Sequence, residues 1–206
     1  MKIFLILIII LFFIFPGCGD QLETSTKDES VNITTNLLAG TWTSKCNGNT
    51  DETTSNKTSI IFYSNVDNIT VTTTNYSDLN CSSESFVFKK VLDNFVLGSK
   101  TTTNQNQIIN KFTAKIDNIT LEPKSSTVTS TLNFHSYCGL SGWAIDNESS
   151  VLGLTCDSTT YNSNNDVHSD IIQMSSEKTF IRMGNITNPD NSDGYPKTLY
   201  SEEYFK

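Results

Sequence analysis

Alanine, arginine, histidine and proline are all scarce in this sequence of 206 residues. It contains three alanines, two histidines, four prolines and a single arginine, Arg182. Alanine is the strongest helix former, so its scarcity disfavours an α-helical fold. His135 and His168 are 33 residues apart and match no spacing of zinc ligands, so we expect both at surface or rim positions. The sequence therefore predicts no metal site and no cofactor.

Positive charge is also in short supply. Fourteen Lys and Arg residues stand against 22 Asp and Glu residues, which gives a net charge of −8. An acidic surface without a cluster of basic residues repels phosphate backbones, so we expect no nucleic acid partner. No nucleophile with its base and no pair of catalytic carboxylates can be placed in the sequence. We therefore expect a protein that is not an enzyme and that has no catalytic residues.

Small polar residues and aromatic residues are abundant instead. Ser, Thr and Asn together number 75, while 36% of the residues are hydrophobic and 10% are aromatic. Thr and the aromatic residues favour β-strands, and the hydrophobic content suffices for a core. A chain of this length corresponds to roughly one domain. The composition predicts one all-β domain.

The N-terminus has the pattern of a secretion signal. Lys2 precedes an unbroken apolar run of 13 residues from Ile3 to Phe15. A membrane-spanning helix needs about 20 apolar residues, whereas a run of this length is typical of a signal-peptide core. We assign residues 1–17 as a signal peptide and expect the mature chain outside the cytoplasm.

The run ends at Gly17-Cys18-Gly19, which resembles the lipobox of bacterial lipoproteins. The resemblance implies that Cys18 becomes the N-terminus and carries acyl chains such as palmitate. It also implies a membrane partner, at the bacterial outer membrane or cell surface. The alternative is ordinary cleavage after Gly19, which would give a secreted protein. Residues 18–36 are mostly polar, so we expect them to form a flexible tether.

Four further cysteines agree with export, namely Cys46, Cys81, Cys138 and Cys156. An even number of cysteines in an extracytoplasmic domain favours disulfides, although three connectivities are possible. We favour Cys46–Cys81 and Cys138–Cys156, because each pair flanks one local block of the sequence. A zinc site is the weaker alternative.

From Leu37 onward, alternating apolar and polar residues predict short strands separated by polar turns. Within Lys111–Leu121 the apolar phase shifts by one residue between Ile116 and Ile119, which indicates a β-bulge. About eight strands predict an antiparallel up-and-down barrel, or a sandwich, over residues 37–206. The predicted strands are Leu37–Cys46, Ser59–Ser64, Asn68–Asn75, Phe86–Val91, Asp93–Gly98, Lys111–Leu121, Val167–Met174 and Lys178–Gly184.

Gly40-Thr41-Trp42, at the start of the first strand, resembles the Gly-x-Trp signature of lipocalins. In lipocalins an arginine on the last strand packs across this tryptophan and closes the base of the barrel. The single arginine of this chain, Arg182, lies on the last predicted strand. The resemblance implies a lipocalin-like barrel closed by the pair Trp42 and Arg182.

A further set of residues, spread over residues 38–206, carries a closer resemblance. These residues are Gly40, Trp42, Ser44, Cys46, Phe62, Tyr63, Tyr76, Asp78, Cys81, Ser136, Tyr137, Cys138, Gly139, Trp143, Cys156, Phe180, Gly184, Pro196, Thr198 and Leu199. With them the chain is similar to the repeated domain of the secreted Wnt antagonists named for down-regulation by adenomatosis polyposis coli, and to bacterial lipoproteins with one such domain. Asn185 stands where these proteins usually have Asp. The resemblance implies a lipocalin-like barrel with disulfides and a disulfide-bonded loop insertion; for the bacterial members it implies no established ligand or reaction.

The sequence is compatible with two functions. The first is a binding protein, because an eight-strand barrel can enclose one small hydrophobic ligand. The second is a cell-surface interaction or adhesion module with a filled barrel, no ligand and a surface protein as partner, in which loops such as 136–165 make the contact. The candidate ligand-lining residues are Phe62, Ile69, Val71, Phe86, Phe88, Phe112, Ile116 and Phe180.

Overall fold

The computed structural model describes residues 31–48, 53–64, 67–103, 105–185 and 193–206. The signal peptide 1–17, the lipidation site Cys18 and tether residues 18–30 lie outside the described residues. The last part of the predicted tether belongs to the folded domain. Ile33 is buried in the hydrophobic core, and helix α1 (Thr35–Leu38) precedes the first strand.

Eight strands form a closed antiparallel barrel, as the sequence predicted. Each strand pairs with the next one along the chain, and the last strand pairs with the first, so the topology is up-and-down. Closure leaves no strand of the barrel with an unpaired edge along its whole length. The eight strands are β1 (Gly40–Ser44), β3 (Ser55–Phe62), β4 (Ile69–Tyr76), β5 (Glu84–Thr102), β6 (Ile108–Pro123), β10 (Val167–Met174), β11 (Phe180–Met183) and β12 (Tyr204–Phe205).

The two longest strands, β5 and β6, differ from the prediction in one respect. The predicted strands Phe86–Val91 and Asp93–Gly98 are one continuous strand, in which Asn94 has a φ of 51° at a register shift. The predicted bulge in β6 is confirmed. Val91 pairs with Asn118 and Leu92 pairs with Ile116, so Asp117 is the extra residue. Bulges increase the local twist, which suits strands that curve around a barrel.

The core of the barrel consists of large apolar side chains from strands that alternate inward and outward. Fully burying one such side chain stabilises the fold by roughly 1.5–3 kcal/mol. Trp42 is the largest of them, and its indole Nε1 donates a hydrogen bond of 2.7 Å to the Leu38 carbonyl oxygen in α1. The other fully buried large side chains include Phe62, Phe112, Ile116, Ile172 and Ile181.

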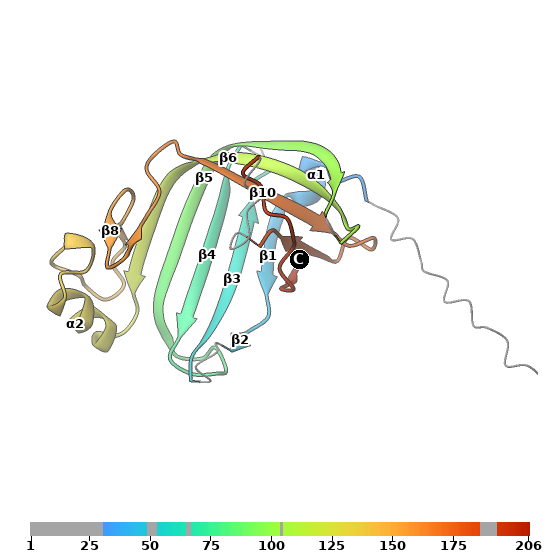
Figure 1. Ribbon diagram of the computed structural model, residues 1–206. Coiled ribbons are helices and arrows are strands. Elements are labelled where there is room, and N and C mark those ends of the chain that lie inside the picture. Colours follow the sequence, from blue (N-terminus) through green and yellow to red (C-terminus); the bar gives the residue numbers. More distant parts are fainter. Residues whose placement is uncertain (1–30, 49–52, 65–66, 104, 186–192) are drawn as a thin grey trace, which may run out of the picture.

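The predicted disulfide-bonded insertion lies between β6 and β10, at residues 124–166, but it contains a helix that the sequence analysis did not predict. This helix is α2 (Ser126–Phe134), and the Ser125 hydroxyl caps it by accepting a hydrogen bond of 3.2 Å from the Val128 N–H. Figure 1 shows α2 and β8 together at one end of the molecule, beyond β5 and β6, with α1 toward the other end. The remaining elements are the 3₁₀-helix η1 (Tyr137–Gly139) and the short strands β2 (Asn47–Gly48), β7 (Ser149–Ser150), β8 (Thr155–Cys156) and β9 (Thr159–Thr160).

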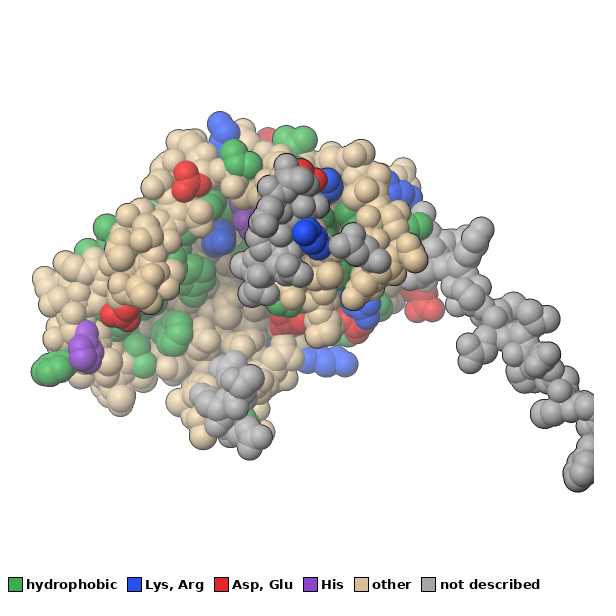
Figure 2. All heavy atoms as spheres, in the orientation of Figure 1, with side chains coloured by type: hydrophobic (Ala, Val, Ile, Leu, Met, Phe, Trp, Pro, Cys, Tyr) green, Lys and Arg blue, Asp and Glu red, His purple; other side chains and the backbone are tan. Residues whose placement is uncertain are grey.

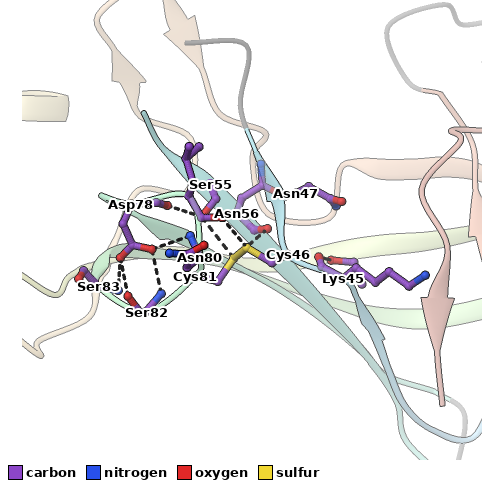
Figure 3. The surroundings of a disulfide bond; sticks show 12 residues. Lys45, Cys46, Asn47, Ser55, Asn56, Asp78, Asn80, Cys81, Ser82 and Ser83 are labelled. Atoms are coloured by element: carbon purple, nitrogen blue, oxygen red, sulfur yellow. Dashed lines mark hydrogen bonds between the residues drawn. A yellow bond between two sulfur atoms is a disulfide. The ribbon is translucent and has the colours of Figure 1, made fainter. Parts of the chain in front are cut away.

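Both favoured disulfides are present. Cys46–Cys81 joins the segment after β1 to the turn between β4 and β5, and Cys138–Cys156 joins η1 to β8. Figure 3 shows the first disulfide beside a turn in which the Asp78 carboxylate accepts hydrogen bonds. The donors are the backbone N–H groups of residues 80, 82 and 83 and the Ser82 hydroxyl. These hydrogen bonds hold the pKa of Asp78 well below its ordinary value, although burial opposes them.

Candidate ligand-binding site

An apolar groove of about 580 Å³ lies between the barrel and the insertion. One wall comes from the inner faces of β4, β5 and β6, and the other comes from α2, η1 and Tyr161. Figure 2 shows the hollow on this side of the molecule, with hydrophobic side chains gathered in it. We call it the groove; its lining residues are Thr73, Asn75, Phe86, Phe88, Leu121, Thr127, Val128, Thr131, Leu132, Tyr137 and Tyr161.

A second cavity of about 170 Å³, which we call the chamber, lies inside the barrel. Thr73 and Phe88 line both cavities, so the groove and the chamber meet at these two side chains. Together they run from the insertion into the barrel interior. The chamber is lined by Ile60, Ile69, Val71, Thr73, Phe88, Lys90, Leu92, Phe112, His168, Asp170, Met183, Gly184, Tyr200 and Tyr204.

The sheet alternation and the disulfide explain how the groove is built. Phe86 and Phe88 lie two residues apart on β5 and therefore face the same side. On α2, Thr127, Val128, Thr131 and Leu132 recur at helical spacing and form one face. The Cys138–Cys156 disulfide fixes η1, and with it the neighbouring Tyr137, against the rest of the insertion.

Aromatic side chains close the groove on the side of the insertion. The rings of Phe88 and Tyr161 stack with their centroids 5.6 Å apart. Burial, and then a hydrogen bond with Tyr137, raise the pKa of Tyr161 to about 12. Like any tyrosine, Tyr161 is uncharged at neutral pH, so this wall of the groove carries no charge from it.

The chamber differs from the groove because it contains charged side chains. Asp170 is 4% exposed, and its Oδ1 accepts hydrogen bonds from the N–H groups of Ile171 at 2.7 Å and Gly184 at 3.1 Å. Its Oδ2 lies 3.7 Å from His168 Nε2. Lys90 projects into the same chamber. Burial lowers its pKa, and the negative charge of Asp170 opposes this shift.

Five of the eight predicted lining residues lie along these cavities. Phe86 and Phe88 line the groove, and Phe88 also lines the chamber with Ile69, Val71 and Phe112. The structure does not bring the other three to either cavity. Phe62 and Ile116 are each 1% exposed in the packed core. Phe180 packs against Phe205 at the closing strand, with ring centroids 6.0 Å apart.

Sequence reasoning missed the charged end of the site. His168 was expected at a surface or rim position, but it lines the chamber and packs against Phe112. A signal was present for Lys90, because it continues the alternation of Phe86, Phe88 and Leu92 on β5. No comparable signal marked Val128, Leu132 or Tyr161, which reach the groove only through the fold of the insertion.

The predicted contact between Trp42 and Arg182 is wrong. Lys206 Nζ lies over the Trp42 ring at 5.2 Å from its centroid. The Arg182 guanidinium lies 5.2 Å from the Phe180 ring centroid and forms an ion pair with Glu203. The reason is the unpredicted strand β12, which pairs with both β11 and β1 and therefore separates the strand of Arg182 from Trp42.

No protein-family model matches this sequence, and no curated protein matches it either. Among the residues that the structure describes, no three His, Cys, Asp or Glu side chains lie close enough together to hold a metal ion. No helix in the described ranges has the length and apolar character needed to cross a membrane.

Proposed function

We propose that this chain is an exported, lipid-anchored binding protein whose lipocalin-like barrel takes a small hydrophobic ligand. The observation that carries the proposal is the apolar groove of about 580 Å³ that meets the chamber inside the barrel. Binding sites for small molecules have volumes of about 300–1,000 Å³ and are lined mainly by apolar and aromatic side chains. The groove has both properties.

The anchoring part of the proposal rests on the sequence. The apolar run of residues 3–15, the Gly17-Cys18 pair and the polar stretch that follows have the order expected of a signal, an acylation site and a tether. Mass spectrometry of the native protein tests it. We expect acyl mass on Cys18 at the mature N-terminus; an unmodified Cys18, or a mature chain that begins at Asp20, would contradict the anchor.

A neutral fluorescent hydrophobe, N-phenylnaphthylamine, tests binding in the groove. We expect saturable fluorescence enhancement with the purified, disulfide-bonded chain. Thr131→Trp should weaken it at least tenfold, because Thr131 is an exposed groove-lining residue of α2 and an indole there fills the space. Ser130→Trp is the matched control. Ser130 is the exposed neighbour on the same helix and does not line the groove.

Two results would contradict binding in the groove. No saturable signal, or equal loss in the two tryptophan variants, would exclude the groove as the site. That outcome would favour the alternative, a surface interaction module. The observation behind this alternative is Phe134, which is 84% exposed at the end of α2. A pull-down with a Phe134→Ser variant as control would then identify the partner.

A further inference from the structure

The charged groups of the chamber indicate which class of hydrophobic ligand the barrel takes. Lys90 lies on the same face of β5 as Phe86, Phe88 and Leu92. Phe88 lines both cavities, whereas Lys90 lines only the chamber. Lys90 therefore lies at the inner end of a path whose outer part is mainly apolar.

The Lys90 side chain interacts with Asp170 only through its charge and forms no hydrogen bond or ion pair in the described part of the chain. No hydrogen bond and no ion pair within 4.0 Å reaches its Nζ from any described residue, although burial desolvates it. A buried charge normally has a partner, because desolvation without compensation is unfavourable. The Lys90 side chain is half-buried and lines the chamber.

The nearest opposite charge, Asp170, is already satisfied by other groups. Its Oδ1 accepts the N–H groups of Ile171 and Gly184, and its Oδ2 faces His168. These contacts hold the Asp170 carboxylate in place beside β10 and the end of β11. From there its negative charge reduces the positive potential around Lys90 without forming an ion pair with it. An ammonium group has three donors and no acceptor, so what fits beside it is an acceptor with negative charge.

We propose that Lys90 binds the carboxylate of an amphiphile, such as a long-chain fatty acid, whose apolar chain lies past Phe88 in the groove. This inference rests on the proposed binding function and names its ligand class. A single negative charge suits the chamber better than a doubly charged phosphate, because Asp170 repels additional charge and the chamber is about 170 Å³. His168 and Tyr200 line the same chamber and carry polar groups that could contact the carboxylate.

Competition against bound N-phenylnaphthylamine tests the inference in the unaltered protein. Palmitic acid and its methyl ester share the apolar chain and differ in the charge of the head group. Hydrogen bonds to charged groups in desolvated sites correspond to tenfold or greater differences in affinity. We expect the acid to displace the probe at a concentration at least tenfold lower than the ester does.

Two lysine variants locate the charge that is responsible. In Lys90→Met, which keeps the length of the side chain, the acid should lose its advantage over the ester when both are compared in that same variant. Lys115→Met removes an exposed lysine from the outer face of β6 and should keep the full preference. Circular dichroism verifies that each variant is folded.

The outcomes separate this inference from the proposed function. If the probe binds but acid and ester displace it equally, the inference is refuted and the binding function stands. A preference for the acid that survives Lys90→Met also refutes it, because another group then recognises the carboxylate. If the probe does not bind at all, the binding function itself fails. The comparison of acid and ester in the unaltered protein decides the matter even if Lys90→Met does not fold.

Discussion

Gly184 lies where β11 ends, and we predict that its replacement by alanine destabilises the barrel severely. A Cβ atom at this position would be closest to Asp170 Oδ1, and it would also lie 2.7 Å from Pro196 Cγ and 2.8 Å from Ile171 Cγ1. Real Cβ atoms essentially never approach heavy atoms within 3.0 Å, so these groups would have to move. The contact with Asp170 matters most, because Gly184 N–H donates a hydrogen bond to that carboxylate.

The size of the effect follows from two costs. Overpacking a core position costs about 1–3 kcal/mol, and loss of a hydrogen bond to a buried charged group costs about 1.5–3 kcal/mol. Because moving Asp170 incurs both, Gly184→Ala should lower the free energy of unfolding by about 3–5 kcal/mol. Urea denaturation with the disulfides intact measures this value.

Gly48→Ala provides the matched control for this experiment. Gly48 lies in β2, and the nearest atom to a Cβ there is Leu79 Cδ2 at 3.7 Å, an ordinary contact. We expect its stability to change by less than about 0.5 kcal/mol. If both variants unfold at the same urea concentration as the unaltered protein, the prediction is wrong. Gly184 would then not pack tightly against Asp170.

Two further predictions concern the disulfides and a tyrosine. A disulfide stabilises more when it closes a longer loop, because it removes more entropy from the unfolded chain. Replacing Cys138 and Cys156, which are 18 residues apart, by serine should lower the free energy of unfolding by about 3 kcal/mol. Replacing Cys46 and Cys81, which are 35 residues apart, should lower it by about 4 kcal/mol. Urea denaturation measures both, and a larger loss for the shorter loop would contradict the chain-entropy argument. The Tyr161 phenol should ionise near pH 12 in ultraviolet titration, because burial raises its pKa to about 12. In the unfolded chain the phenol ionises near about pH 10. The contribution of Tyr161 to the free energy of unfolding is therefore complete below about pH 10 and is lost as the pH rises to about 12. Tyr161→Phe should remove this part of the pH dependence.

The sequence predicted the barrel well because alternation along a strand is a local property. Val167–Met174 has the bounds that the alternation predicted, and the phase shift in β6 placed a bulge between Ile116 and Ile119, where Asp117 is the extra residue. The disulfides were predictable for the same reason, since each pair closes a local block. Lys90 could have been recognised from the same alternation, which places it with the aromatic residues of β5.

The other features depend on contacts between distant segments, which no local pattern encodes. Strand β12 consists of two residues, Tyr204 and Phe205, too few to show a period. Without β12 the pair of Arg182 with Trp42 was a reasonable expectation; with β12 between their strands, the two side chains contact other partners. Helix α2 is rich in Ser and Thr, which are weak helix formers, and its Ser125 cap and buried Leu132 outweigh that composition.

The position of β12 has a consequence for how the chain can fold. Synthesis delivers the chain from its N-terminus, so β1 and β3 emerge before the other strands of the barrel and can pair with each other. The other edge of β1 stays without its partner until residues 204 and 205 have emerged, because β12 alone bridges β1 and β11. Until then the molecule is an open sheet with two exposed edges and an accessible interior. Closure of the ring is therefore a late, non-local step, and a chain stopped before Tyr204 retains most of its strands but presents two edges that can pair with another molecule.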